Sequence, residues 1–364
     1  MLRIDADTHV QLTEETWSYM TEAEREIKPI LLEPIPGRNF VPGDKRPHQA
    51  WIIDGRVTLN QYRDDVRSGT TADTRELRDV AARVRHMDEL GVDVQVLYPN
   101  VFLGLVTENP EVEVALCRSY NRWLADKTAE SNGRLRWVIV PPLLDMDAAL
   151  DELRFGKDHG ACGVFKRAID CGGKPVSNSY FYPLYEEAMR LDLPICIHTG
   201  GSNVASRSMA ASPDDRGTSG LGVDQTIGCF SSLAIRRVPD RFPQLRFGVI
   251  EAMASWIPYV IAKMTAQVTY NTHRDKPREV KFKEDFLREN RFYVTLHVSD
   301  DVPYLLKFGA EDSLMIGTDY AHEDAASVQG ALDMVEQLGE NGDIPMEVAR
   351  KILDDNPRTF YGLN

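Results

Sequence analysis

The sequence predicts an α/β fold, a (β/α)8 TIM barrel with insertions after its first and fifth strands. Eight short apolar runs, amphipathic stretches between them, and polar residues that close several runs lead to this prediction. The predicted strands are Leu2–His9, Val92–Tyr98, Arg136–Pro141, Gly163–Ala168, Pro194–His198, Arg246–Glu251, Phe292–His297 and Leu314–Asp319. Eight alternating units fit a closed barrel better than an open doubly wound sheet, which stays open as the alternative.

The helices are predicted from apolar residues at three- and four-residue intervals. In Thr74–Leu90 this pattern runs from Leu77 to Leu90, and Gly91 offers a stop. The other predicted helices are Glu111–Ala129, Met146–Lys157, Tyr182–Leu191, Thr226–Val238, Ser255–Val268, Phe282–Glu289, Ala325–Leu338 and Met346–Leu353.

Two segments interrupt the repeat within what we predict to be one barrel over residues 1–364. Residues 11–71 are rich in Pro, Gly and charge, and residues 200–222 are rich in Ser, Gly and Asp. Because the loops that follow barrel strands form the active face, we interpret both segments as lids over a site. A flap that binds a partner and plain surface padding are the alternatives.

Composition narrows the function classes. The chain has 364 residues, 42 Lys+Arg against 56 Asp+Glu and a net charge of −14, and no basic stripe that would favour nucleic acid. It shows neither a secretory leader nor the roughly 18 uninterrupted apolar residues of a membrane span. The five Cys form no CxxC motif, which favours reduced thiols. We therefore expect a cytoplasmic protein without a nucleic-acid or membrane partner.

Polar residues close several apolar strands at their C-terminal ends. Asp7 and His9 lie two apart on one face of strand one, and strands five, six and eight end at His198, Glu251 and Asp319. Taken singly, each fits a turn cap or a hydrogen-bonded core residue. In a barrel all five point into one mouth, where imidazoles mixed with carboxylates are typical ligands of a first-row transition metal.

Several short motifs, in this order, resemble a known family. They are Asp7-Thr8-His9, the strand that ends at His198, the segment Arg241–Phe247, the segment Gly317–His322, and Asn356-Pro357-Arg358. On these the sequence resembles, over essentially its whole length, the amidohydrolase superfamily, and within it the amidohydrolase-2 (aminocarboxymuconate-semialdehyde-decarboxylase-like) family.

The resemblance implies a metal held by Asp7, His9, His198 and Asp319. Two departures stand out: Asp7 replaces the first His of the family's His-x-His motif, and Glu251 replaces a His at the end of strand six. Glu251 is interpreted as a proton-transfer residue or an additional ligand. A salt bridge to an arginine such as Arg167 is the structural alternative.

Other polar residues near the predicted mouth have more than one reading. Lys166, on strand four, lies where binuclear members of the superfamily carry a carboxylated lysine, so the resemblance leaves a second ion open. The adjacent Arg167 is a candidate for binding a substrate carboxylate. Asp319 is predicted to transfer protons as well as to bind the ion, His322 to assist catalysis beside it, and His297 to contact substrate.

The function predicted first is a metal-dependent hydrolase that uses a metal-activated water on an amide, ester or thioester of a small substrate. The first alternative is a non-oxidative, metal-dependent decarboxylase of an aromatic or unsaturated carboxylic acid, and the second is a catalytically silent barrel that binds a small acid. Zinc is the expected ion, with iron or manganese as alternatives and one or two ions bound. A homodimer is expected from the resemblance.

Overall fold

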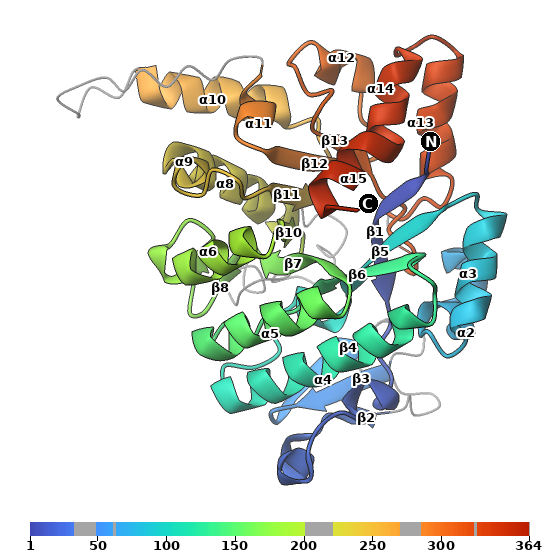
Figure 1. The fold of residues 1–364 in the computed structure, drawn as a ribbon, viewed down its shortest axis with the longest axis vertical. Coiled ribbons are helices and arrows are strands. Elements are labelled where there is room, and N and C mark those ends of the chain that lie inside the picture. The colour runs from blue at the N-terminus through green and yellow to red at the C-terminus, as the bar shows by residue number, and fades with distance from the viewer. Residues whose placement is uncertain (33–48, 61–62, 201–220, 270–284, 324–325, 364) are drawn as a thin grey trace, which may run out of the picture.

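Eight parallel strands form one sheet that curls into a nearly closed barrel (Figure 1). The computed structural model describes residues 1–32, 49–60, 63–200, 221–269, 285–323 and 326–363. The barrel strands are β1 (Ile4–Val10), β5 (Val94–Pro99), β6 (Leu135–Ile139), β7 (Ala161–Arg167), β10 (Ile195–His198), β11 (Phe247–Ile250), β12 (Phe292–Leu296) and β13 (Leu314–Ile316), in that order around the sheet. The predicted barrel is confirmed.

The barrel closes where β13 returns to β1. The backbone N–H of Asp319 donates to the carbonyl of Asp7 at 2.9 Å, and that of His9 donates to the carbonyl of Tyr320 at 2.9 Å. These bonds join the segment after β13 to the C-terminal half of β1. Closure therefore brings Asp319 beside Asp7 and His9.

Two strands end earlier than the sequence predicts. β11 ends at Ile250, directly before Glu251, and β13 ends at Ile316, three residues before Asp319. Glu251 and Asp319 have left-handed backbone, with φ of 54° and 52°. Side chains other than glycine rarely adopt this left-handed backbone, so it cannot be predicted from a carboxylate in the sequence. The two carboxylates lie on turns above the barrel rather than on its strands.

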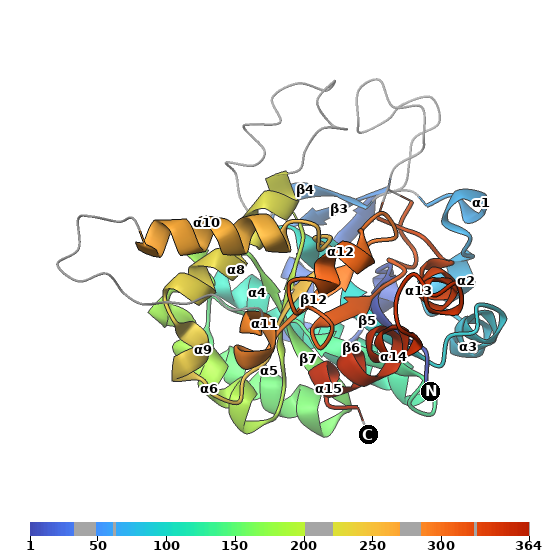
Figure 2. The same ribbon diagram turned by 90° about the horizontal axis from the view of Figure 1, so that it is seen from above.

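Helices surround the sheet (Figure 2). Their bounds are α1 Asp65–Ser68, α2 Ala72–Arg75, α3 Val80–Glu89, α4 Pro110–Ala129, α5 Met146–Asp158, α6 Tyr182–Arg190, α8 Leu221–Ile235, α9 Val238–Arg241, α10 Ile257–Thr269, α11 Phe286–Glu289, α12 Val302–Leu306, α13 Ala331–Glu340, α14 Met346–Arg350, a π-helical turn Lys351–Asp355 and α15 Asn356–Tyr361. Short 3-10 helices at Val101–Leu103 and Ser179–Phe181, and the hairpin β8 (Ile169–Asp170) and β9 (Lys174–Pro175), complete the loops outside the first insertion.

The predicted helix Thr74–Leu90 is two helices, α2 and α3. The chain breaks at Leu77, whose φ is 53°, and α3 restarts at Asp79, whose side chain accepts from the N–H of Ala82 at 2.9 Å. The aspartate cap satisfies a helix-terminal N–H that has no partner within the helix. The apolar pattern from Leu77 to Leu90 begins after the end of α2 at Arg75 and therefore belongs to the break and to α3.

The insertion after β1 carries a small sheet that the sequence analysis missed. Two 3-10 helices (Glu14–Trp17 and Glu22–Ile27) precede an antiparallel sheet of β2 (Ile30–Leu32), β3 (Gln49–Ile53) and β4 (Arg56–Asn60). Trp17 and Trp51 are buried and meet edge to face at 5.9 Å. Ser119 of α4 donates to the carbonyl of Thr16 at 2.7 Å and ties the insertion to the barrel.

The second predicted lid covers residues 200–222. Residues 201–220 of it lie outside the described part of the chain.

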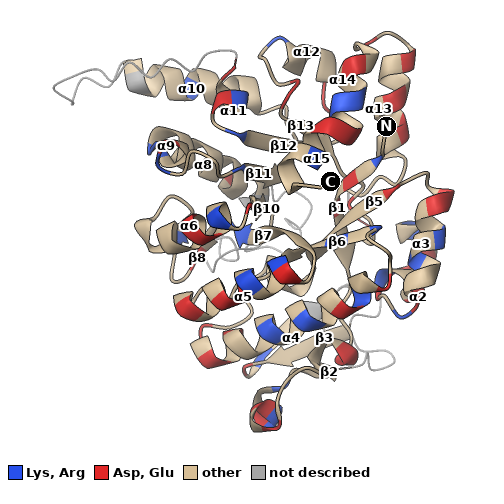
Figure 3. Cartoon of the chain, viewed as in Figure 1, with Lys and Arg blue, Asp and Glu red and all other residues tan. Residues whose placement is uncertain are grey.

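None of the helices in the described ranges is long and apolar enough to cross a membrane. Acidic and basic side chains are interspersed over the outer helices α3, α4 and α5 (Figure 3).

An ionic contact between α5 and α6 makes stability depend on pH. The carboxylate of Glu187 accepts from Arg190 at 2.7 and 2.8 Å and from Arg154 at 2.6 Å. These hydrogen bonds, with those of Arg190 largest, lower the pKa of Glu187 to about 2. A depressed carboxyl pKa stabilises the fold above the unfolded value near 4.3, and the stabilisation is lost as the pH falls toward the folded pKa.

We expect Glu187→Gln to lower the free energy of unfolding at pH 7 by about 1–2 kcal/mol, because the arginines lose a charged acceptor. The penalty should shrink at pH 3. Denaturant unfolding at both pH values measures it, with the exposed neighbour Glu186→Gln as the control. An equal penalty at both pH values would contradict the assignment.

Candidate metal centre

Two imidazoles and two carboxylates meet at the C-terminal mouth of the barrel. The Nε2 atom of His9 lies 3.2 Å from Asp319 Oδ1 and 3.7 Å from Asp7 Oδ1. His198 Nε2 lies 3.3 Å from the same Asp7 oxygen. All four residues are buried, with at most 2% of their surface exposed. Segments separated by more than a hundred residues thus converge as the barrel prediction requires.

Backbone carbonyls select the tautomer of both imidazoles. His9 Nδ1 lies 3.2 Å from the carbonyl of Pro99, and His198 Nδ1 lies 2.7 Å from that of Thr199. Because a carbonyl only accepts, each Nδ1 carries a proton, and each Nε2 faces the carboxylates, where it can hold a second proton or bind a cation. Metal-bound histidines commonly have this arrangement.

The donor set fits a divalent cation. Within the described part of the chain, His9 Nε2 is buried and makes no hydrogen bond, although two carboxylates lie close to it. A lone pair facing carboxylates is unfavourable unless a proton or a cation lies between them. Mixed imidazole and carboxylate ligands are typical of zinc, iron and manganese sites.

The histidines differ in their electrostatics. Burial lowers the pKa of His9 well below its usual value, and the charges of His322, His198 and Arg63 lower it further. Burial would also lower the pKa of His198, but the carboxylates of Asp7 and Glu251 outweigh it and raise that pKa to about 9. Asp7 therefore favours positive charge at His198, whether proton or cation.

His322 lies against the cluster as predicted from its place after Asp319. Its ring stacks on that of His9 at 3.9 Å, and its Nδ1 atom lies 2.7 Å from Asp319 Oδ1. Burial, followed by the charge of Arg63, lowers the pKa of His322 well below its usual value. An imidazole in contact with Asp319 can relay a proton to that carboxylate if its other nitrogen takes up a proton as Nδ1 gives one up.

Glu251 also reaches the cluster. Its Oε2 atom lies 3.4 Å from His198 Nδ1. It belongs to both sets of side chains whose ligand atoms lie within 4.8 Å of one another, which are Asp7, His9, His198 and Glu251, and His9, Glu251, Asp319 and His322. The structure thus places Glu251 beside the metal-type cluster rather than in a salt bridge with Arg167.

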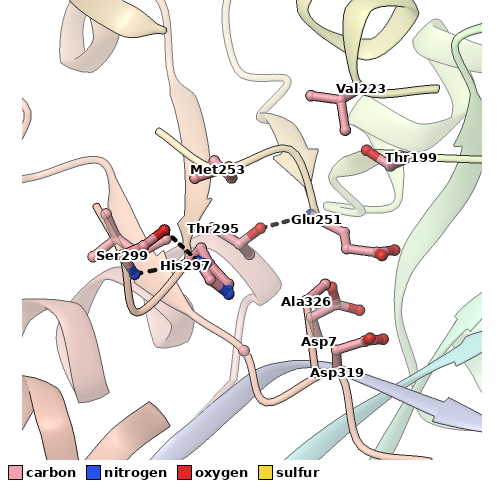
Figure 4. A pocket seen from close by; sticks show the side chains of 12 residues that line it. Asp7, Thr199, Val223, Glu251, Met253, Thr295, His297, Ser299, Asp319 and Ala326 are labelled. Carbon is pink, nitrogen blue, oxygen red and sulfur yellow. Dashed lines mark hydrogen bonds between the residues drawn. The ribbon is translucent and has the colours of Figure 1, made fainter. Parts of the chain in front are cut away.

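A cavity of about 350 Å³ opens above the cluster (Figure 4). Asp7, Glu251 and Asp319 lie on one side of it, and His297 lies across from them. The other lining residues are mostly small or apolar, namely Thr199, Val223, Met253, Thr295, Leu296, Ser299, Gly317 and Ala326. The site therefore combines a polar floor with walls suited to a flat, largely apolar molecule.

His297 is half-buried, and its Nδ1 atom lies 2.7 Å from the Ser299 hydroxyl. That contact orients the ring at the cavity wall. Its predicted contact with substrate is compatible with this position and stays a prediction.

The structure does not bring Lys166 to the cluster. Its ammonium pairs with Asp170, donates to the carbonyl of Arg167 at 3.0 Å and lies 4.0 Å from the centre of the Phe181 ring. Strand alternation sends this side chain away from the mouth. A carboxylated lysine bridging two ions, as the resemblance allowed, does not fit this arrangement.

Arg167 is likewise engaged within the protein. Its Nε atom donates to Asp170 at 2.5 Å, and its Nη1 atom donates to the carbonyls of Phe102 and Gly104 at 3.0 and 3.2 Å. It fixes the loop after β5, and it does not line the cavity above the cluster. The predicted contact with a substrate carboxylate is therefore not supported by this geometry.

Gly317 provides the room that Asp7 needs. A Cβ atom at residue 317 would lie 2.4 Å from Asp7 Cβ and 3.0 Å from its backbone nitrogen. We expect Gly317→Ala to displace Asp7, to cost about 1–3 kcal/mol of stability through overpacking, and to weaken metal binding. Thermal unfolding and metal titration measure these effects. Gly228→Ala, at an exposed helical position with open space, is the control, and unchanged metal affinity in Gly317→Ala would contradict this role.

The comparisons with known proteins agree with this geometry. A model of the Amidohydro_2 family of amidohydrolases matches residues 4–363. This chain belongs to that family. The resemblance noted in the sequence is thus confirmed over nearly the whole chain.

The amidohydrolase is similar to curated and solved members. The gamma-resorcylate decarboxylase of Rhodococcus jostii (strain RHA1) is 26% identical over 281 residues, which cover 70% of this chain and 83% of that protein. An amidohydrolase of Mycobacterium avium subsp. paratuberculosis K-10 has a TM-score of 0.76 at 19% identity, covering 100% of this chain and 98% of the other.

A dihydroxybenzoic acid decarboxylase of Polaromonas sp. JS666, solved with manganese and 2-nitroresorcinol, has a TM-score of 0.65 at 18% identity, covering 100% of this chain and 97% of the other. The names of these decarboxylases favour the alternative function predicted from the sequence over the hydrolase predicted first.

One positioning residue of this amidohydrolase escaped the sequence analysis. Asp300 is buried and accepts from the backbone N–H groups of Ala254, Ser255 and His297, each at 2.9 Å. It joins the loops that follow β11 and β12, which carry Glu251 and His297. In the sequence, Asp300 has the pattern of an ordinary turn residue before a helix. Nothing in that pattern distinguishes it from its neighbour Asp301, which caps α12.

Proposed function

We propose that this chain is a divalent-metal-dependent, non-oxidative decarboxylase of a small hydroxylated aromatic carboxylic acid. The observation that carries the proposal is the imidazole and carboxylate cluster at the floor of a cavity with mostly apolar walls. The decarboxylases among its relatives support the choice of reaction. An aromatic ring fits between the walls while its carboxylate faces the floor.

We propose Asp7, His9, His198 and Asp319 as the residues that hold the ion. When bound, such an ion supplies a Lewis acid that fixes the substrate's oxygen atoms and offsets negative charge. The relative solved with manganese supports that metal, with zinc and iron as alternatives. Lys166 is occupied elsewhere, so we propose one ion rather than two.

Asp319 is the proposed proton donor. It delivers its proton to the ring carbon that bears the carboxylate. This protonation interrupts the aromaticity of the ring. The bond from that carbon to the carboxylate then breaks, its electron pair restores the ring, and carbon dioxide leaves. His322, 2.7 Å from Asp319 Oδ1, returns a proton to Asp319 from solvent.

The cavity walls position the ring. Val223, Met253 and Leu296 offer apolar contacts, and His297 is proposed to hydrogen-bond a ring hydroxyl. The insertion of residues 11–71 and the loop of residues 200–222 are the proposed lids. The charge of Arg63, at the end of the first segment, lowers the pKa of both His9 and His322, which is consistent with the first of these lids. A cytoplasmic location and a homodimer remain part of the proposal.

Product analysis tests the proposed reaction. The metal-loaded protein is incubated with 2,6-dihydroxybenzoate and related hydroxybenzoates, and in parallel with phenyl esters and thioesters, while carbon dioxide and organic products are measured. We expect carbon dioxide and the corresponding phenol from at least one acid. Cleavage of an ester or thioester without release of carbon dioxide would favour the hydrolase function instead. Stoichiometric binding of an acid without turnover would indicate a catalytically silent barrel.

A further inference from the structure

We infer that Glu251 is a fifth ligand of the ion and that this third carboxylate makes the centre favour manganese(II) over zinc(II). The inference rests on the proposed metal-dependent function and deepens it. It concerns a residue that departs from the pattern of the resembling family.

The position of Glu251 supports direct ligation. In one set of side chains, a carboxylate oxygen of Glu251 lies within 4.8 Å of ligand atoms of Asp7, His9 and His198. In a second set, an oxygen of Glu251 lies within 4.8 Å of ligand atoms of His9, Asp319 and His322. Ligands on opposite sides of an ion with bonds near 2.1 Å lie about 4.2 Å apart. The carboxylates of Asp7, Glu251 and Asp319 gather on one side of the cavity (Figure 4).

The buried Nε2 atom of His9 points into the same group. His9 is fully buried, and this nitrogen makes no hydrogen bond to the described residues. His9 belongs to both sets of side chains that contain Glu251. His9 and Glu251 are therefore the two residues common to the set that holds Asp7 and His198 and the set that holds Asp319.

The backbone holds Glu251 in this place at a conformational cost. Its φ of 54° is left-handed, a conformation that is unfavourable for an L-residue other than glycine. The N–H of Glu251 donates to the hydroxyl of Thr295 at 2.8 Å, which secures the turn. Asp319 has the same conformation, with φ of 52°. Strained residues of this kind concentrate at functional sites.

The ligand count determines the metal preference. With Glu251, three carboxylates and two imidazoles would be available to hold the ion. Zinc is satisfied by four ligands, whereas manganese favours six ligands and carboxylate oxygen. Loss of Glu251 should therefore matter more for manganese than for zinc.

Metal titration without substrate tests this inference. The metal-free protein is titrated with Mn²⁺ and with Zn²⁺ against a competing chromophoric chelator, and bound Mn²⁺ is followed by electron paramagnetic resonance. We expect Glu251→Gln to weaken Mn²⁺ binding by about 10-fold or more and Zn²⁺ binding by less than about 3-fold. The spectrum of bound Mn²⁺ should change in the same variant.

Two further variants control for folding and for charge. Thr295→Val keeps the carboxylate but removes the hydroxyl that holds its turn, so we expect a smaller loss of Mn²⁺ affinity in the same direction. Glu311→Gln removes one negative charge beside Lys351 on the surface and should leave both affinities unchanged.

Unchanged Mn²⁺ affinity and spectrum in a folded Glu251→Gln protein would overturn the inference, as would equal weakening of both ions. If wild-type protein still released carbon dioxide, the proposed function would survive that failure. Conversely, the protein could bind manganese through Glu251 and yet release no carbon dioxide. That result would contradict the proposed decarboxylase function but not the inference about Glu251.

Discussion

Replacing Asp319 with asparagine is expected to lower the rate of carbon dioxide release by about 10³-fold, because an amide cannot deliver the proton that the ring carbon needs. The turn should survive the change. Asp319 has φ of 52°, and asparagine is among the residues that tolerate left-handed backbone. The effect should appear in kcat, measured with saturating substrate and excess metal.

The matched control for Asp319 is Asp312→Asn. Asp312 is a partly exposed carboxylate that pairs with Lys351 at 2.8 Å and does not line the cavity. It should keep wild-type kcat. If Asp319→Asn with metal bound kept kcat within about 10-fold of wild type, general acid catalysis by this residue would be excluded.

Replacing His198 with alanine is expected to weaken metal binding by about 100-fold or more and to abolish turnover at stoichiometric metal. His198 presents Nε2 to Asp7 while Thr199 holds its Nδ1 proton, so its loss removes one ligand and leaves the Asp7 carboxylate buried without its imidazole. Inductively coupled plasma mass spectrometry after gel filtration measures the retained ion.

His159→Gln serves as the control for this substitution. That histidine is exposed at the end of α5, and its Nδ1 atom contacts the carbonyl of Phe155. It should keep stoichiometric metal and full activity. Stoichiometric metal in the His198→Ala protein would remove His198 from the ligand set.

The sequence predicted the part of the site that lies on regular strands. Asp7, His9 and His198 lie in β1 and β10, where side-chain alternation and strand ends fix their direction once the barrel is assumed. Glu251 and Asp319 were expected at strand ends, but their left-handed turns were not. No local pattern predicts that conformation, because tertiary contacts such as the Thr295 hydroxyl impose it.

Strand four shows a second limit of sequence reasoning. Alternation indicates that Lys166 and Arg167 face opposite ways, but it does not indicate which one faces the mouth. The structure settles this through partners distant from the strand in sequence, the Phe181 ring for Lys166 and the carbonyl of Phe102 for Arg167. The sequence could not decide between hydrolysis and decarboxylation for a different reason, because the same cluster of ligands can serve both reactions.

The most direct test of the metal centre is an anomalous difference map from crystals of the protein purified with manganese. We predict one strong peak at the barrel mouth, within about 2.0–2.3 Å of ligand atoms of Asp7, His9, His198 and Asp319. A map without a peak between these four side chains, in crystals of folded protein, would contradict the account.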